Sequence, residues 1–469
     1  MQWMTLWIEA LSAGPLWMKT AALAAISTLG AMLLALPAGW ALARRRSGLL
    51  LGLVLALAVL PTSISAIGWI AAFGSQGILP LPWLYSPAGV TLAWTLCFWP
   101  LAALGIWAAL SRAESGEEEA ALMILPPWKA GWKLILPRAL PALAATATAI
   151  FILMLGDLGV PGCLSVSVGA ESVHARFLST FRTGAALGAS LPMLALAMLA
   201  AWLCRKGWAG LGGSASGSGA KGLEEISRAG SALAWIFLLA YLMIPVWGLA
   251  GWALQGGGFS KALALLGQEG MTTLMLAAAT GLLAAAFGFA LSFSLPRRLS
   301  GAVSWGAVLL FAAPGTLVGA GLIRLFNAEG WRGALYASPL ILLIALLARS
   351  LAPALLLVRR SLAELPPSYD EAARLAGVPF WRRACSLSGP LCAGSLAAGA
   401  LAAAVIAAGE LGTSALVSPP GVQTLAVRLF SLIHYGADAA VAATALMGMG
   451  GVMILGCLIS GRLSGRVAR

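Results

Sequence analysis

Acidic residues recur in matched pairs along this 469-residue chain, and they are the first candidates for chemistry. Glu119 and Glu371 each open a Glu-Ala-Ala triplet, and Asp157 and Glu410 each stand in a Gly-acid-Leu-Gly sequence. Carboxylates can transfer protons, bind metals or form ion pairs, but the partners that catalysis needs are missing. The sequence has no HExxH, no GxSxG and no carboxylate pair four residues apart within an apolar run. We therefore predict no catalytic residue and no metal site.

The sequence also lacks motifs that bind nucleotides or structural metals. No GxxxxGK[ST] phosphate loop occurs, and the nearest sequence, GSGAKG at 217–222, has the wrong spacing. The six cysteines form no CxxC pair, so the pattern favours neither a disulfide framework nor a zinc site. We expect that the chain binds no cofactor itself and is not an enzyme.

The composition indicates the scaffold that holds these acids. Hydrophobic residues make up 60% of the chain and charged residues only 10%, with a mean hydropathy of +0.93. A membrane-spanning helix needs about 20 apolar residues. Eleven runs qualify, near 19–43, 48–73, 87–111, 139–158, 184–204, 231–255, 270–295, 302–326, 334–358, 391–412 and 436–460. The sequence thus predicts an all-α polytopic membrane protein with about eleven transmembrane helices, or twelve if an upstream start adds one.

Basic residues give the predicted orientation of these spans. If Arg44, Arg45 and Arg46 are cytoplasmic, alternation places 21 of the 29 lysine and arginine residues on that side. The net charge of +13 is then explained by membrane topology, so we predict no nucleic-acid partner.

The chain contains an internal repeat with an offset of 252 or 253 residues. Matched pairs include Pro61 and Pro314, Pro100 and Pro353, Glu119 and Glu371, and Arg176 and Arg428. Five spans repeat in parallel, and the extra span 231–255 returns the chain to the starting side. We predict a first half at 1–210 with five spans, a cytoplasmic Gly/Ser-rich linker at 211–230, and a second half at 231–469 with six spans. Parallel repeats are typical of transporters, with the path between the halves.

The long cytoplasmic loops 112–138 and 359–390 occupy matching places in the two halves. In the second loop the sequence predicts a short helix at 368–376 with Ser368 as its N-cap. Gly377 suits the left-handed position after the helix. A second, basic helix containing Trp381 then returns toward the membrane, which gives a helix-turn-helix on the cytoplasmic surface.

These loops resemble the signature of the membrane subunits of binding-protein-dependent ABC importers: Glu-Ala-Ala, three residues, Gly, nine residues, an apolar position and Pro. The second loop matches it at Glu371, Ala372, Ala373, Gly377 and Pro390, and the first at Glu119, Ala120, Ala121 and Pro137. The first copy is degenerate, because it is one residue shorter and has Leu125 where the turn glycine is expected. Pro126 and Pro127 are expected to make its turn.

The resemblance covers essentially the whole chain and is greatest to fused two-half permeases of the ferric-iron and thiamine importers. The stretch 409–436 is similar to the ferric-iron type. The resemblance implies a permease in the bacterial inner (plasma) membrane that imports ferric iron, with thiamine or another small solute as the alternative. It also implies two partners: a cytoplasmic ABC ATPase dimer, which binds ATP and magnesium and docks on both loops, and an extracytoplasmic substrate-binding protein. ATP binding would then drive alternation between outward and inward access.

Two other classes of protein fit these features less well. An ion-coupled secondary transporter also has repeats, but it needs ionisable residues near the middle of the membrane, and these spans hold few. A scaffold protein would not require two matched loops.

Asp157 and Glu410 are predicted at the outer ends of their spans. They are candidates for an outer gate or for ion pairs with Arg176 and Arg428, and the alternative is that they only reach water at the membrane surface. Arg349, which lies within a span, is expected to extend toward the interface.

Overall fold

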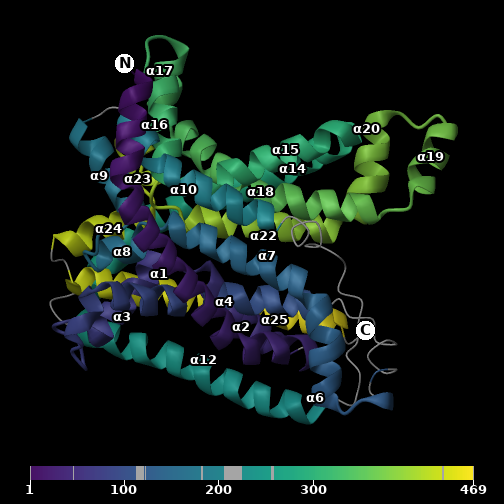
Figure 1. Cartoon of the computed structure of the whole chain (residues 1–469), viewed down its shortest axis with the longest axis horizontal. Helices are drawn as coiled ribbons and strands as arrows, with labels where there is room; N and C mark the ends of the chain where they lie inside the picture. Colours follow the sequence, from purple (N-terminus) through teal and green to yellow (C-terminus); the bar gives the residue numbers. More distant parts are fainter. Residues whose placement is uncertain are drawn as a thin grey trace.

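A computed structural model describes residues 2–45, 47–111, 121, 123–180, 183–204, 224–254, 258–435 and 438–467. The described residues form helices and connecting turns, and no β-strand occurs among them (Figure 1). The all-α fold class is therefore confirmed. Glu119, Ala120 and most of the predicted linker at 211–230 lie outside the described residues.

The helices run in the order of the predicted spans. The first half contains α1 (Gln2–Arg45), α2 (Gly48–Val59), α3 (Thr62–Phe73), the 3-10 turn Pro82–Tyr85, α4 (Pro87–Leu110), α6 (Pro127–Ala130), the π-helical turn Gly131–Ile135, α7 (Leu136–Leu155), α8 (Gly159–Cys163), α9 (Gly169–Thr180) and α10 (Thr183–Leu203). The rest contains α12 (Glu224–Ala253), α13 (Gly258–Leu265), the π-helical turn Leu266–Gly270, α14 (Met271–Ser294), α15 (Arg297–Ala312), α16 (Gly315–Phe326), α17 (Trp331–Tyr336), α18 (Pro339–Glu364), α19 (Pro367–Leu375), α20 (Phe380–Arg382), the π-helical turn Arg383–Ser388, α21 (Gly389–Leu391), α22 (Ala393–Gly409), α23 (Ser414–Val417), α24 (Leu425–His434) and α25 (Asp438–Val467).

Among the described residues, seven helices are long and apolar enough to cross a membrane, or up to ten if each of three bent pairs is one span. The apolar segment Ala439–Ile454 of α25 adds a shorter helix. Each of the eleven predicted runs coincides with one member of this set. The polytopic character is therefore confirmed, while the count of eleven spans stays a prediction.

Two runs that were predicted as continuous spans are broken at matched prolines. The 48–73 run bends by 95° between α2 and α3, and the 302–326 run bends by 104° between α15 and α16. Pro61 and Pro314 stand at these bends with nearly equal backbone angles, φ −53° and ψ 139° against φ −57° and ψ 140°. Proline has no N–H to donate and clashes with the preceding turn, so the helix cannot continue through it.

Equivalent helices of the two halves pack alike. α1 packs on α4 as α14 packs on α18, and α8 meets α3 as α23 meets α16. The last helix of each half crosses over, because α10 contacts α15 and α16 while α25 contacts α2 and α3. α12, which the predicted boundaries assign to the second half, packs on α1, α3 and α25. The halves are thus interlocked, and the boundaries at 1–210 and 231–469 stay predictions.

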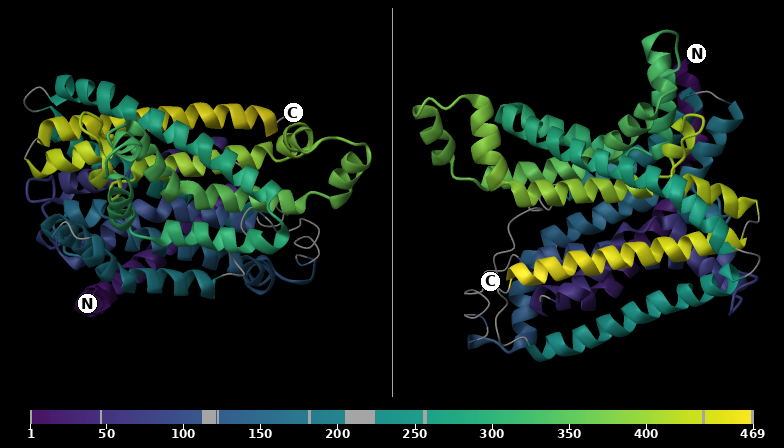
Figure 2. Two further views of the ribbon diagram at one scale, coloured as in Figure 1. Left: turned by 90° about the horizontal axis from the view of Figure 1, so that it is seen from above. Right: turned by 180° about the vertical axis from the view of Figure 1, so that it is seen from behind.

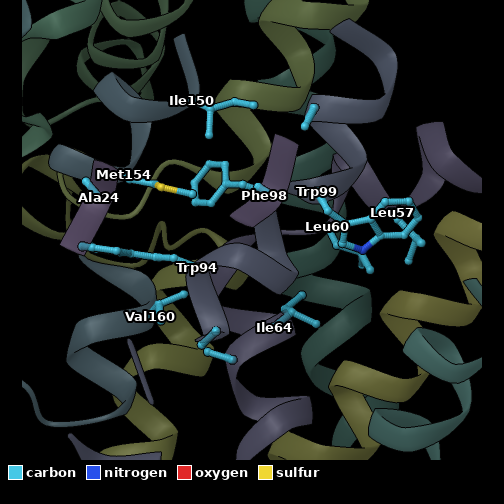
Figure 3. Packing of buried hydrophobic residues seen from close by; sticks show 14 of the residues in the cluster. Ala24, Leu57, Leu60, Ile64, Trp94, Phe98, Trp99, Ile150, Met154 and Val160 are labelled. Carbon is cyan, nitrogen blue, oxygen red and sulfur yellow. The ribbon is translucent and has the colours of Figure 1, made fainter. Parts of the chain in front are cut away.

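Large apolar side chains fill the first half, and close helix contacts build the second. Figure 3 shows Met154 of α7 beside Phe98 of α4, with Trp94 and Trp99 buried nearby. In the second half α14, α18 and α22 approach each other closely; a Cβ on Gly281, for example, would overlap the carbonyl oxygen of Ala400. Small residues permit such backbone contacts between membrane helices.

Figure 2 shows how the two groups of helices are arranged relative to each other. Contacts between the halves include those of α10 with α15 and α16 and those of α24 with α3 and α8. The ribbons of the two groups diverge toward the end of the bundle that carries α19 (Figure 2). The polar residues described below lie where the halves meet.

Candidate functional site

The helix pair formed by α19 and α20 projects beyond the ends of the other helices at one end of the bundle (Figure 1). We call residues 365–391 the hairpin. α19 ends in two paired hydrogen bonds: the Val378 N–H donates to the carbonyl of Ala373, and the Gly377 N–H donates to that of Arg374, both at 3.0 Å. Gly377 has φ +69°. This is the Schellman arrangement, which requires a left-handed residue and favours glycine, so the predicted turn at Gly377 is confirmed.

The predicted N-cap is wrong in detail. α19 begins at Pro367 with Pro366 in the capping position and no side-chain hydrogen bond there, so Ser368 lies inside the first turn. Proline favours the first helical position because its fixed φ suits a helix and its missing N–H would be unpaired there anyway. The helix therefore starts one residue earlier than predicted.

Ion pairs and ring contacts hold the hairpin in one shape. Asp370 of α19 forms ion pairs at 2.8 Å with Arg374 on its own helix and with Arg383 on the returning segment. Arg383 is buried. Phe380 packs on Phe293 of α14 with ring centroids 5.0 Å apart. The hairpin is therefore fastened both across its own turn and to the bundle.

The outer surface of the hairpin is exposed and partly apolar. Leu375 is 90% exposed and Trp381 73% exposed. The signature residues Glu371 and Ala372 are exposed, Ala373 is half-buried, and Pro390 stands in α21 where the chain re-enters the bundle. An exposed leucine and tryptophan on a fastened helix are features of a contact surface.

The first loop is described only in part. Ala121 belongs to a helical turn, and the exposed Met123 and Ile124 follow it. Pro126 separates this turn from α6, whose first residue is Pro127, so the two prolines lie at the predicted turn. Pro137 lies exposed in the first turn of α7. Figure 1 places α6 and α19 at the same end of the bundle.

Asp157 follows the C-terminus of α7 and lies against the break between α2 and α3. One carboxylate oxygen accepts hydrogen bonds from the Thr62 hydroxyl at 2.7 Å and the Gly159 N–H at 3.2 Å. The other accepts from the Trp94 indole N–H at 2.8 Å and the Val160 N–H at 3.1 Å. An ionised carboxylate only accepts hydrogen bonds and therefore matches these four donors. Asp157 thus joins the start of α3 to the start of α8.

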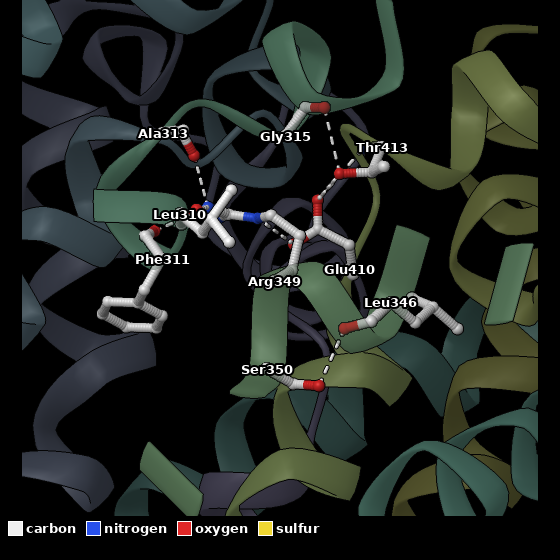
Figure 4. Close-up of polar contacts among 9 residues, drawn as sticks. All are labelled: Leu310, Phe311, Ala313, Gly315, Leu346, Arg349, Ser350, Glu410 and Thr413. Atoms are coloured by element: carbon white, nitrogen blue, oxygen red, sulfur yellow. Dashed lines mark hydrogen bonds and ion pairs between the residues drawn. The ribbon is translucent and has the colours of Figure 1, made fainter. Parts of the chain in front are cut away.

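Glu410 occupies the equivalent place in the second half, after the C-terminus of α22. One oxygen pairs with the Arg349 guanidinium at 3.2 Å, and the other accepts the Thr413 N–H at 3.1 Å. The Thr413 hydroxyl lies 3.0 Å both from this second oxygen and from the Gly315 carbonyl, at the start of α16 (Figure 4). Glu410 therefore lies at the break between α15 and α16.

Arg349 completes the second arrangement from α18. Its guanidinium also donates to the carbonyls of Phe311 at 2.6 Å, Leu310 at 3.4 Å and Ala313, which belong to the C-terminal end of α15 and the residue after it (Figure 4). The last carbonyls of a helix lack intrahelical partners and attract cations. Arg349 and Glu410 are 5% and 9% exposed.

Two predictions about these charges are wrong. Glu410 pairs with Arg349, and Arg428 lies 3.6 Å from Glu269, so the predicted ion pair between Glu410 and Arg428 is wrong. Asp157 accepts hydrogen bonds from uncharged donors, and its ion pair with Arg176 stays a prediction. Arg349 does not extend to the interface but is buried. Arg349 and Asp157 instead contact backbone and hydroxyl groups at the helix breaks, which need partners inside the protein.

A cavity of about 110 Å³ lies between the halves at this level. Its wall contains Pro61, Thr62 and Asp157 from the first half and Arg349, Gly409 and Glu410 from the second. Arg176 and Arg428 are absent from its described lining. It has room for several water molecules. Among the described residues no group of three or more His, Cys, Asp or Glu could hold a metal ion.

Comparison with known proteins adds the decisive observation. Residues 277–469 match the model of the family described as "Binding-protein-dependent transport system inner membrane component". This part of the chain belongs to that family. The match begins in α14 and includes Arg349, the hairpin, α22 and Glu410. The described helices and this match together indicate a multi-pass inner-membrane protein whose residues 277–469 are similar to the membrane components of binding-protein-dependent transport systems.

Curated relatives carry different substrates in their names. The chain is 24% identical over 344 residues to the putative ferric transport system permease protein FbpB 1 of Haemophilus influenzae, covering 66% of this chain and 53% of the relative. It is 30% identical over 129 residues to the putative 2-aminoethylphosphonate transport system permease protein PhnU of Salmonella typhi, covering 24% and 43%. The chain spans about half the length of the curated relatives it matches.

Sequence reasoning missed Arg349 although a signal was present. An arginine inside an apolar span is costly and is a functional candidate by default. The matched position 253 residues earlier is Leu96, so the charge is specific to the second half.

Proposed function

We propose that this protein is the permease of an ATP-driven importer for ferric iron. In this proposal the two loops, including Glu119, Ala120, Ala121 and Pro137 in the first, dock a cytoplasmic ATPase dimer that binds ATP and magnesium. A separate extracytoplasmic binding protein delivers the substrate to the path between the halves, and Asp157 and Glu410 form a gate on that path.

The exposed, fastened hairpin is the observation that carries the proposal. A lever must present a surface to its partner and must not deform when it is pushed. Leu375 and Trp381 provide the apolar surface, and the two ion pairs of Asp370 resist deformation. The hairpin is continuous with α18 on one side and with α21 and α22 on the other, so its displacement reaches both helices that carry the buried charges.

The docking role is tested by substitutions in the hairpin. Gly377→Pro fixes φ near −65°, which is incompatible with the observed +69°, and Glu371→Ala removes the signature acid without changing the turn. We expect both variants to reach the membrane folded and to lose uptake while the ATPase still hydrolyses ATP. Normal uptake by Gly377→Pro would contradict the docking role.

The partners are tested by purification of the tagged chain from its native membranes in mild detergent. Two ATPase copies per chain support the importer. The copurified binding protein is then assayed with ferric iron, thiamine and 2-aminoethylphosphonate, because the FbpB 1 name favours iron only through 24% identity. Preference for either organic solute would overturn the assignment of iron.

The competing class is an ion-coupled secondary transporter, which the buried charges at the cavity make worth testing. In sealed vesicles that contain the chain but no ATPase, uptake that collapses with the proton gradient would establish that class. Uptake that requires the ATPase, nucleotide and the binding protein supports the importer.

A further inference from the structure

We propose that the Arg349–Glu410 ion pair is a positioning device that holds the cavity between the halves closed. Movement of the hairpin separates the two charges. The inference deepens the proposed function and rests on it for the identity of the driving partner. Arg349 and Glu410 act through the helix ends that they hold and need not contact the substrate.

The connectivity brings hairpin and ion pair together. Arg349 lies on α18, which ends at Glu364, and only two residues separate Glu364 from Pro367, where α19 begins. Glu410 directly follows α22, which the hairpin enters through α21. At a rise of 1.5 Å per residue, about 22 Å of α18 and about 26 Å of α22 separate the charges from the hairpin. The two helices also pack on each other along their length. A tilt or slide of one helix relative to the other therefore changes the distance between guanidinium and carboxylate.

The ion pair holds the parts that form the cavity wall. Arg349 donates hydrogen bonds to the carbonyls at the end of α15. Glu410 contacts the start of α16 through the hydroxyl of Thr413. The guanidinium also lies against the first half: a Cβ placed on Gly156 would be 3.8 Å from its terminal nitrogen. The ion pair therefore links the two sides of the helix break at the boundary between the halves, and its separation lets the two sides move independently.

The carbonyl contacts make such a separation reversible. When Glu410 moves away, the guanidinium still has the α15 carbonyls as partners, and Glu410 keeps the N–H and hydroxyl of Thr413. A buried charge with no other partner would be far more costly to uncouple. The arrangement thus provides two states that differ mainly in one ion pair.

The pair occurs in only one half of the repeat. The first half has Leu96 at the position of Arg349, and its acid, Asp157, is held by Thr62 and Trp94 instead. The half with the complete docking signature is therefore also the half with the buried ion pair, which we call the lock. The half with the degenerate loop has uncharged donors at the equivalent place. We infer that the hairpin of the second half controls the closure.

The first test measures access to the cavity with no nucleotide and no partner protein added. Ile406, which lines the cavity, is replaced by Cys, and its reaction with a small charged methanethiosulfonate reagent in native membranes is followed by peptide mass spectrometry, which separates position 406 from the six native cysteines. A thiol reacts as the thiolate and therefore needs water access. We expect Arg349→Met, Glu410→Gln and the double variant each to raise the labelling rate at least ten-fold.

Two controls keep the result interpretable. Arg324→Met makes the same substitution at an exposed position of α16 and should leave labelling unchanged. The double variant has no unpaired charge and should disturb the fold least. Each variant is used only if it elutes as the parent does in size-exclusion chromatography. Labelling within two-fold of the parent in the folded double variant would overturn the lock.

The final arm tests transmission from the hairpin. With the copurified ATPase and a non-hydrolysable ATP analogue, labelling of the parent should change, whereas the Arg349→Met chain should label rapidly with or without nucleotide. An equal response in both chains would overturn transmission while leaving the importer intact. If the lock variants label as expected but no ATPase binds the chain, the proposed importer function is rejected and the lock is not.

Discussion

The free-energy costs of removing the two charges of the Arg349–Glu410 pair should be far from additive. Arg349 and Glu410 are 5% and 9% exposed, so a single neutral substitution leaves the partner charged in a low-dielectric site. Loss of one member of such a pair costs about 3–5 kcal/mol. The double variant Arg349→Met/Glu410→Gln has no unpaired charge. It removes the donor from three carbonyls at the end of α15, at about 1–3 kcal/mol for each that is left unpaired, and Arg349→Met alone carries the same cost.

If the two sites were independent, the double variant would lose about 6–10 kcal/mol, so the expected coupling free energy is several kcal/mol. The assay is a denaturant titration of the purified chain in mixed micelles, followed by the fluorescence of its 19 tryptophans. The Arg360–Glu364 pair on the same helix is the matched control. It is separated by 2.9 Å but is 41% and 36% exposed, and its coupling should be only about 0.3–0.5 kcal/mol. A buried pair that couples no more strongly than this control refutes the reasoning.

Three further outcomes are expected. Gly315→Ala should destabilise the fold because its Cβ would overlap a Glu410 oxygen, whereas Gly321→Ala on the same helix meets no atom within 4 Å and should be neutral or stabilising by up to about 1 kcal/mol in the same titration. Gly377→Ala has open space but keeps a left-handed φ of +69°, so its hairpin amides should exchange hydrogen faster, by about 1–2 kcal/mol of local stability. Burial lowers the pKa of His174, so the unfolded chain binds the proton more readily; stability should fall as the pH drops below about 6.5, and His174→Gln should lessen that dependence.

Features set by local sequence were predictable. The apolar runs mark the helices because only continuous internal hydrogen bonding satisfies a backbone in lipid. The turn at Gly377 was predictable because a left-handed C-terminal residue is a local requirement that glycine meets. The internal repeat was sufficient to assign Asp157 and Glu410 to equivalent places in the two halves.

Partners across the fold were not predictable in the same way. Hydropathy sums over a window and does not register direction, so it treats a run bent by 104° at Pro314 as one span. Arg176 and Arg428 seemed suitable partners for the acids because they recur in the repeat. The nearest donors are instead set by the breaks, where the ends of α3, α15 and α16 present unpaired backbone groups inside the bundle. Only the packing of α18 against α15 and α22 brings Arg349 to that place.

The two halves meet the same physical demand with different chemistry. A helix broken within a membrane exposes carbonyls on one side of the break and N–H groups on the other, and both must find partners inside the protein. At the start of α3, Asp157 is held by hydroxyl, indole and amide donors that carry no charge. At the break between α15 and α16, the partners are two opposite charges, Arg349 on α18 and Glu410 at the end of α22. Their attraction depends steeply on their separation in a low-dielectric site. Neutral contacts suit a fixed wall, and an ion pair between movable helices suits a part that changes state. The asymmetry of the charges is therefore what the proposed separation of the Arg349–Glu410 pair by α18 and α22 predicts.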